Sequence, residues 1–262
     1  MTSSVRFSGV TKIYGTATGR VEALKDIDFE VRKGEFLSVL GPSGCGKSTL
    51  LAMASGLDRP TQGRVEVNGT AVDRAVTDLG IVFQTDVLLD WLTVMGNVML
   101  QIEMRKLDRA VFEPRARELL ASVGLAGFED KRPYELSGGM RQRASICRAL
   151  VHDPGLLLMD EPFGALDAIT REQMVSELDR IWTATRKSVM FVTHDIAEAI
   201  YLADRVLVMT PRPGRIAEII DVDLPRPRAA HMRESPAFLA LVARARNLFI
   251  RSGVLHADGQ SA

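Results

Sequence analysis

The sequence has little cysteine and no long hydrophobic run, and each absence excludes a class of protein. Its two cysteines, Cys45 and Cys147, offer no disulfide framework, so we expect a reducing, cytoplasmic setting. No apolar stretch approaches the ~20 residues of a membrane-spanning helix, so we expect that the chain itself does not cross a membrane. The first four residues lead directly into a strand-like segment, which predicts that the chain has no signal peptide.

A surplus of charge of either sign is also missing. The 33 basic and 33 acidic side chains balance to a formal net charge of zero. Proteins that bind nucleic acids usually carry a basic surplus, so the balanced charge disfavours that class. Hydrophobic residues make up 46% of the 262 residues, which is ample for a core and too much for a disordered chain. This length and composition predict one large α/β domain, or one domain with a small appendage.

The order of the apolar segments predicts how the chain is organised. Short strand-like segments alternate with turns over residues 5–68, and residues 93–152 are expected to be mainly helical. From residue 155 onward strands alternate with helices, which predicts a parallel sheet. Pro-Arg-Pro-Arg at 225–228 is interpreted as a linker. Other expected elements are a strand at 79–83, helices at 107–123 and 167–185, and an amphipathic helix at 235–251 with Phe238, Leu241, Val242, Leu248 and Phe249 on one side.

A glycine-rich segment at residues 41–49 is the most informative feature of the chain. It reads Gly-Pro-Ser-Gly-Cys-Gly-Lys-Ser-Thr, follows the apolar run 36–40 and opens a run of helix formers. This order predicts a phosphate-binding loop, because backbone N–H groups and the positive end of a helix dipole then face an anion. Lys47 can reach the β- and γ-phosphates of a nucleotide, and Ser48 can place its hydroxyl on Mg²⁺. A glycine-rich turn that binds no ligand is the alternative.

Further segments accompany this loop in a fixed order. Leu-Ser-Gly-Gly at 136–139 precedes a helical run with Ser137 as a natural N-cap, which makes it a second candidate anion site, or an ordinary capped helix. An apolar strand then ends in Asp160 and Glu161, and His194 follows another apolar strand. We find no internal repeat, so we expect one nucleotide-binding unit per chain.

In this order the segments closely resemble the ATP-binding subunits of ABC transporters, over about residues 14–215. The resemblance implies an α/β fold: a P-loop NTPase core with a parallel sheet, an N-terminal antiparallel β layer and an inserted helical subdomain. It implies an ATPase domain over residues 1–224 with the helical subdomain at about 93–152, and a linker with a C-terminal amphipathic helix over 225–262. ATP and Mg²⁺ are the implied cofactors, and ATP hydrolysis that drives translocation is the implied activity.

The resemblance also assigns roles to individual residues. Glu161 is the general base that faces the attacking water, His194 contacts the γ-phosphate, and Gln84 senses the metal and the water. Without the resemblance, carboxylates that cap a strand end, a structural histidine and a packed strand aromatic at position 14 remain alternatives. The implied catalytic residues are Lys47, Gln84, Glu161 and His194, and the implied metal ligands are Ser48, Gln84 and Asp160. The implied nucleotide-binding residues are Tyr14, which stacks on adenine, then Gly41, Pro42, Ser43, Gly44, Cys45, Gly46, Lys47, Ser48 and Thr49, and Ser137, Gly138 and Gly139.

The segment at Ser137 resembles the one that closes over the nucleotide of an opposite subunit, which implies a head-to-tail homodimer that buries two ATP molecules. Asp167 resembles a residue of the loop that crosses this dimer seam. Met140 departs from the pattern, because the family usually has Gln there and a thioether cannot replace the hydrogen bonds of an amide. The N–H groups of Gly138 and Gly139 remain, so we expect function to survive.

Other stretches resemble the importers for nitrate, sulfonates and taurine. They are residues 160–171, 213–216, 235–238 and 88–94, the last with Asp90 where the family usually has Pro. The resemblance implies a peripheral subunit on the cytoplasmic face of the inner (plasma) membrane, with two transmembrane permease chains as partners, a solute-binding protein as an indirect partner, and no nucleic acid. Uptake of aromatic acids or pyrimidines, export or lipid transport, and a soluble ABC ATPase remain as alternatives.

The two cysteines are expected to differ in reactivity. Cys45 lies at a helix start beside Lys47, and both features favour the thiolate, so we expect rapid labelling against which Mg-ATP protects. The alternative is that the Cys45 thiol points into the core. Cys147 lies within a helical run and is expected to be an inert packed thiol.

Overall fold

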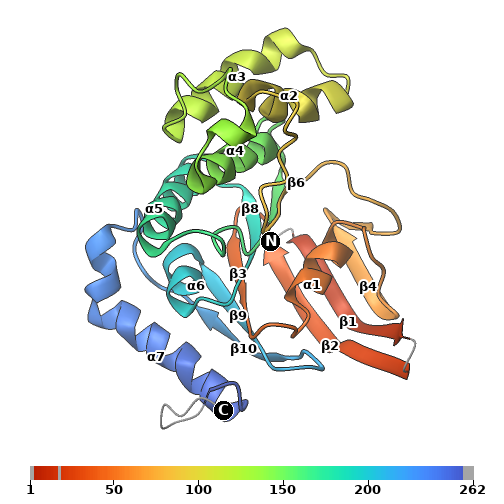
Figure 1. Cartoon of the computed structure of the whole chain (residues 1–262). Helices are drawn as coiled ribbons and strands as arrows, with labels where there is room; N and C mark the ends of the chain where they lie inside the picture. Colours follow the sequence, from red (N-terminus) through yellow and green to blue (C-terminus); the bar gives the residue numbers. More distant parts are fainter. Residues whose placement is uncertain (1–2, 17–18, 256–262) are drawn as a thin grey trace. The chain divides into compact units, whose positions relative to one another are not determined.

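The computed structural model describes residues 3–16 and 19–255, which divide into two compact units. The first unit combines residues 1–77 with 179–262, and the second comprises residues 78–178. The second boundary therefore falls within the long helix α5 (Ala168–Thr185), which was predicted from residue 167 (Figure 1). None of the helices in the described part of the chain is long and apolar enough to cross a membrane.

The N-terminal part of the first unit is an antiparallel sheet, as predicted. Its strands are β1 (Ser3–Thr16), β2 (Gly19–Arg32), β4 (Gln62–Val67) and β5 (Thr70–Ala71), in the order β2-β1-β4-β5. Strand β1 pairs with both β2 and β4. The rings of Phe7 and Phe29 stack at 4.7 Å across β1 and β2, so the apolar positions of these strands share one face.

The first unit also contains the predicted parallel strands. Strand β3 (Phe36–Leu40) pairs in parallel with β8 (Ser188–Thr193) and with β9 (Arg205–Met209), and β10 (Ile216–Asp221) adds an antiparallel neighbour to β9. Every residue of β3, β8 and β9 is buried, which explains their continuous apolar sequences. Helix α1 (Lys47–Ala54) follows β3, and α6 (Ile196–Leu202) follows β8. Leu40, the last residue of β3, pairs with Thr193, the last residue of β8. The loop at 41–49 and His194 therefore follow neighbouring strand ends.

The second unit is mainly helical. Its helices α2 (Val94–Met104), α3 (Arg109–Ser122) and α4 (Gly138–Leu150) begin at side-chain caps from Thr93, Asp108 and Ser137, and a 3₁₀ turn, η1 (Pro133–Glu135), precedes α4. Two short strands, β6 (Gly80–Val82) and β7 (Leu156–Asp160), pair in parallel. Val82 pairs with Met159, so Gln84 and Glu161 follow strand ends that lie side by side.

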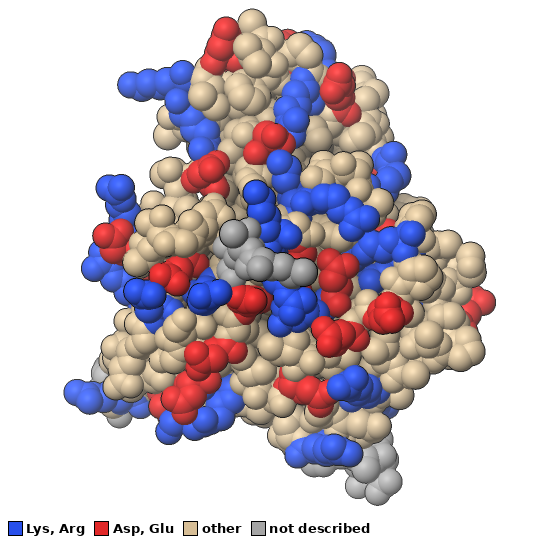
Figure 2. All heavy atoms as spheres, turned by 180° about the vertical axis from the view of Figure 1, so that it is seen from behind, with Lys and Arg blue, Asp and Glu red and all other residues tan. Residues whose placement is uncertain are grey.

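The C-terminal segment of the first unit contains the predicted amphipathic helix. A 3₁₀ turn, η2 (Ala230–Glu234), leads into α7 (Pro236–Arg251), whose N-cap Ser235 accepts a hydrogen bond from the backbone N–H of Phe238 at 3.2 Å. Phe238 and Phe249 are buried, and α7 lies beside α6 and β10 (Figure 1). Figure 2 shows basic and acidic side chains interspersed over one face of the molecule, in line with the balanced charge.

Candidate functional site

Glycines shape the loop at residues 41–49, as predicted. Gly44 and Gly46 have φ angles of +75° and +103°, in the left-handed region that favours glycine, and Gly46 is the N-cap of α1. A β-carbon on Gly46 would lie 2.5 Å from Cδ2 of Leu24, so the backbone approaches its neighbour too closely for a side chain. The loop therefore delivers the chain directly to the N-terminal end of α1, where the positive end of the helix dipole lies.

Lys47 folds back over this loop. Its side chain is buried, and its Nζ donates to the carbonyl oxygens of Gly41 at 2.9 Å and Pro42 at 3.0 Å. The first turn of α1 contains no acidic residue that would offset the positive end of the helix dipole. The loop and the ammonium group thus form a positively polarised surface suited to phosphate groups.

Residues 212–214 brace the loop from the other side. The Arg212 guanidinium donates to the carbonyl of Gly44 at 3.3 Å, and the N–H of Gly214 donates to the carbonyl of Ala23 at 2.9 Å. A β-carbon on Gly214 would overlap the carbonyl oxygen of Cys45. The sequence identified this segment only by resemblance, and the structure supplies the physical reason for its glycine.

Burial of Cys45 contradicts the prediction of a reactive thiol. The residue is 1% exposed, and a β-carbon on Gly41 would lie 2.7 Å from its Sγ. The thiol therefore fills the space that the missing side chain of Gly41 leaves, and it points into the protein. Cys147 is buried as expected, and burial raises the pKa of its thiol far above the ordinary value.

Tyr14 lies next to the first helix and is held by two residues that sequence reasoning missed. Its hydroxyl donates to Asp58 at 2.7 Å and lies 3.5 Å from the hydroxyl of Thr49, while the Nζ of Lys12 lies 4.7 Å from the ring centroid. Burial raises the pKa of Tyr14. Burial acts to raise the pKa of Asp58 as well, but hydrogen bonds from Lys12 and Tyr14 outweigh it and hold that pKa below its ordinary value.

His194 is exposed in a turn that is firmly bonded on both sides. The Thr193 hydroxyl donates to the Glu198 carboxylate at 2.8 Å and accepts from the N–H of Asp195 at 3.0 Å. The Asp195 carboxylate in turn caps α6 by accepting from the N–H of Glu198 at 2.8 Å. These bonds fix the backbone at His194 and leave its imidazole accessible at a strand end.

Gln84 and Glu161 come together in the second unit. A β-carbon on Gly164 would lie 3.6 Å from Nε2 of Gln84 and 3.9 Å from Oε2 of Glu161, so both side chains lie against this glycine. Glu161 has a φ angle of +42°, which is unusual for a residue with a side chain and costs about 1–3 kcal/mol. Asp160, the last residue of β7, is half-buried beside it. A carboxylate, which can accept a proton, and an amide, which can orient a water molecule, thus lie together at one sheet edge.

The Leu-Ser-Gly-Gly segment forms the start of α4, as predicted. The Ser137 hydroxyl accepts from the N–H of Met140 at 3.3 Å, and Ser137 and Gly138 are exposed. A β-carbon on Gly139 would lie 2.7 Å from Cγ2 of Thr170, at the start of α5. Asp167 accepts from the N–H of Thr170 at 3.0 Å, and hydrogen bonds from Thr170 lower the Asp167 pKa. Within the second unit, the Leu-Ser-Gly-Gly segment therefore lies next to the turn of Asp167, the residue that the resemblance assigns to the dimer seam.

Two arginines of α4 hold the segment that follows Gln84, and sequence reasoning missed both. Arg141 pairs with the Asp86 carboxylate at 2.9 Å, and Arg148 donates to the carbonyls of Asp86 and Val87 at 2.9 Å each. Burial lowers the pKa of Arg148. The spacing of the arginines by seven residues on one helix was the signal that could have indicated their common partner.

Comparison with known proteins identifies the family. The family model for ABC transporters matches residues 24–164. An uncharacterized ABC transporter ATP-binding protein of Methanocaldococcus jannaschii is 49% identical over 87% of this chain and 85% of its own length. The taurine import ATP-binding protein TauB of Pelagibacter ubique is 49% identical over 78% of this chain and 77% of its own length. The aliphatic sulfonates import ATP-binding protein SsuB of Bacillus cereus is 40% identical over 96% of this chain and 98% of its own length.

A solved structure agrees with these relatives. The dimeric post-hydrolysis state of an ATP-binding cassette bound to ADP and Pi superposes with a TM-score of 0.74 at 32% identity, covering 84% of this chain and all of that chain. The family model matches more than half of this chain, and the relatives cover most of it. The chain therefore belongs to the ATP-binding subunits of the ABC transporter family.

Proposed function

We propose that this chain is the ATP-hydrolysing subunit of an ABC importer that takes up a small anion of the nitrate, sulfonate or taurine class. The observation that carries the proposal is the similarity, over 78% and 96% of the chain, to proteins named for taurine import and for aliphatic sulfonate import. The geometry of the loop at residues 41–49 supports the nucleotide part of the proposal, because a helix start and a buried lysine there suit phosphates.

We assign the chemistry to this chain's own residues as follows. Lys47 exchanges the carbonyls that it now contacts for phosphate oxygens, and the loop N–H groups bind the same anion. Glu161 takes a proton from the attacking water, which Gln84 and His194 orient. Tyr14 supports the adenine ring. The other residues that we assign to nucleotide binding are the loop residues 41–46, 48 and 49.

Magnesium fits the donors that the family resemblance assigns to it. Ser48 supplies a hydroxyl, Gln84 an amide and Asp160 a carboxylate, and Mg²⁺ prefers such oxygen ligands together with waters and substrate phosphates. Among residues 3–16 and 19–255 no group of three or more His, Cys, Asp or Glu side chains is placed to hold a metal ion. We therefore propose that Mg²⁺ binds with ATP rather than to the protein alone, and that it neutralises charge on the phosphates.

We further propose that the chain works as a head-to-tail homodimer on the cytoplasmic face of the plasma membrane. The exposed start of α4, at Ser137 and Gly138, would then meet the nucleotide of the second copy. Dimeric cassettes among the similar structures support a dimer. Two permease chains would span the membrane, and a solute-binding protein would deliver the solute to them. We also propose that residues 1–224 form the ATPase domain, with an inserted helical part at about 93–152, and that residues 225–262 form its appendage.

The assembled transporter provides the test. The chain is purified with its two permeases in lipid vesicles, and ATP hydrolysis is measured with the solute-binding protein and taurine, an alkanesulfonate or nitrate. Stimulation by one of these anions supports the proposal. Stimulation only by an aromatic acid or a pyrimidine excludes the small-anion class. Absence of hydrolysis under every condition excludes the ATPase role.

A further inference from the structure

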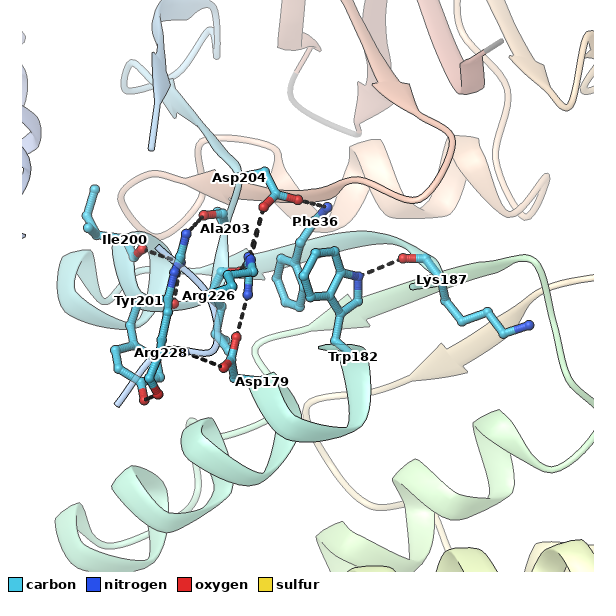
Figure 3. Close-up of polar contacts among 11 residues, drawn as sticks. Phe36, Asp179, Trp182, Lys187, Ile200, Tyr201, Ala203, Asp204, Arg226 and Arg228 are labelled. Carbon is cyan, nitrogen blue, oxygen red and sulfur yellow. Dashed lines mark hydrogen bonds and ion pairs between the residues drawn. The ribbon is translucent and has the colours of Figure 1, made fainter. Parts of the chain in front are cut away.

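Arg228 lies buried against the C-terminal end of helix α6. Its guanidinium donates to the carbonyl oxygens of Ile200 at 2.9 Å and Ala203 at 2.7 Å, and also to that of Tyr201 (Figure 3). The last carbonyls of a helix lack partners within the helix, and residues 196–202 contain no basic side chain that could reach them. Arg228 therefore supplies, from 25 to 28 residues further along the chain, the C-terminal cap that α6 does not supply itself.

Arg226 reinforces this contact from the neighbouring side. Its guanidinium lies 4.0 Å from the centroid of the Trp182 ring, forms an ion pair with Asp179, and donates to Asp204 at 3.0 Å (Figure 3). It also donates to the carbonyl of Leu202 at 2.6 Å, one residue from those that Arg228 contacts. We call Arg226 and Arg228, with the groups that they bind on α5 and α6, the arginine clasp.

The contacts of the clasp are reciprocal. The Tyr201 hydroxyl donates to the carbonyl of Arg228 at 2.6 Å, and the N–H of Arg228 donates to the Asp179 carboxylate at 3.4 Å. Both Tyr201 and Arg228 are buried, and burial is the main cause that lowers the pKa of Arg228 to about 10. A charged side chain is buried at such cost only where its hydrogen bonds are largely satisfied, so residues 226–228 are an integral part of the α6 surface.

The other end of α6 carries the turn with His194. Helix α6 has seven residues, so it consists of about two turns and its two ends are about 10 Å apart. The turn at its C-terminal end therefore adjoins the turn at its N-terminal end. The first turn is bonded to Thr193 and Asp195 through Glu198. A shift or tilt of the C-terminal end of so short a helix is therefore transmitted to the backbone at His194.

We propose that Arg226 and Arg228 are positioning residues for His194, because the clasp fixes the helix whose first turn holds that histidine. The inference rests on the role proposed above for His194 in hydrolysis. It gives residues 225–228 a function in the catalytic cycle that a connecting linker would not have. None of the clasp contacts described here involves the proposed nucleotide-binding loop at 41–49. We therefore expect a change in the clasp to lower the rate of hydrolysis without weakening ATP binding.

The first experiment measures steady-state hydrolysis by the full chain carrying Arg228→Lys. Lysine keeps the charge but offers a point donor in place of the planar fork, so it cannot serve three carbonyls in the same geometry. We expect kcat to fall about tenfold, because small displacements of a reacting group cost that much, while KM for ATP changes less than about twofold. Arg244→Lys is the matched control, since Arg244 pairs with Glu218 on the exposed side of α7, and it should leave both constants unchanged. A parallel rise in KM, or an unchanged kcat, overturns the inference.

The second experiment distinguishes positioning from general loss of structure. Arg228→Lys is combined with His194→Ala, and hydrolysis is followed in a single turnover. If the clasp acts through His194, Arg228→Lys lowers the rate of the His194→Ala variant less than about twofold further, whereas independent effects multiply. Multiplying losses overturn the inference and leave the role of His194 intact. If His194→Ala alone has no effect, the proposed role of His194 fails and the inference fails with it.

Circular dichroism melting accompanies both experiments. Where Arg228→Lys does not fold, Tyr201→Phe replaces it, because it removes only the hydroxyl that holds the Arg228 carbonyl and keeps the buried ring. Tyr201→Phe is then combined with His194→Ala, and the single-turnover rates are compared by the same criteria.

Discussion

The close approach of Gly214 to the glycine-rich loop at residues 41–49 makes Gly214→Ala an informative perturbation. A β-carbon at this position would overlap the carbonyl oxygen of Cys45 and lie 2.9 Å from Cε of Met209, whereas real β-carbons essentially never come within 3.0 Å of another heavy atom. Hydrogen bonds to Ala23 and Lys25 hold Gly214 on both sides, at 2.9 Å and 3.0 Å, so the glycine backbone cannot simply withdraw. The loop around Cys45 must move instead.

The size of that movement sets the expected effect. Restoring contact distance requires a displacement of about 1 Å, and a misplacement of this size at a binding or reacting group can cost up to about a hundredfold. We expect Gly214→Ala to weaken ATP binding about tenfold or more and to destabilise the fold by about 1–3 kcal/mol through overpacking. Because the substitution acts on the loop at residues 41–49, the loss should fall mainly on ATP affinity.

Titration with a fluorescent ATP analogue and a thermal melt measure the two effects. Gly155→Ala is the matched control, since a β-carbon there meets nothing within 4 Å, and it should change neither quantity. Wild-type affinity and melting temperature in Gly214→Ala would refute the argument that residues 212–214 brace the loop.

Other substitutions and modifications test the assigned roles. Glu161→Gln should lower turnover about 10²–10⁴-fold while ATP still binds, because an amide cannot accept the proton of water; near-wild-type turnover would exclude Glu161 as the base. Ser137→Arg should abolish hydrolysis by the assembled transporter, since it places a bulky side chain at the exposed helix start and removes the cap, whereas Met140→Gln should leave hydrolysis about unchanged. Maleimide should label Cys45 and Cys147 slowly in the folded protein and rapidly after denaturation, as mass spectrometry can show; fast labelling of Cys45 alone would contradict its burial.

Local sequence predicts the features whose causes are local. The apolar run 36–40 and the glycines after it predict a buried strand and a left-handed turn, because each depends on a few adjacent residues. The same holds for the cap at Ser137 and for α7, whose apolar periodicity matches its buried side.

Contacts between distant residues are invisible to that reasoning. The environment of Cys45 was misjudged because the local signals, Lys47 and a helix start, indicate an activated thiol, while the space beside Gly41 that buries it exists only in the folded protein. The Pro-Arg-Pro-Arg segment at 225–228 has the composition of a linker. In the structure, however, Arg226 binds Asp179 and packs on Trp182. These partners lie more than 40 residues earlier in the chain, so local sequence reasoning could not predict the contacts.

The departure at Met140 shows how far a side-chain pattern constrains this site. In the structure the backbone N–H of Met140, not its side chain, closes the cap on Ser137, and the N–H groups of the first turn belong to every residue type except proline. No acidic residue lies in that turn, so the positive end of the α4 dipole is not offset there. A side chain at this position would therefore only supplement the backbone N–H groups, which carry the proposed anion contact. Gly139 is different, because a β-carbon there would lie 2.7 Å from Thr170, and substitution would push α4 away from the start of α5. The segment should therefore tolerate exchange at Met140 and should not tolerate it one residue earlier.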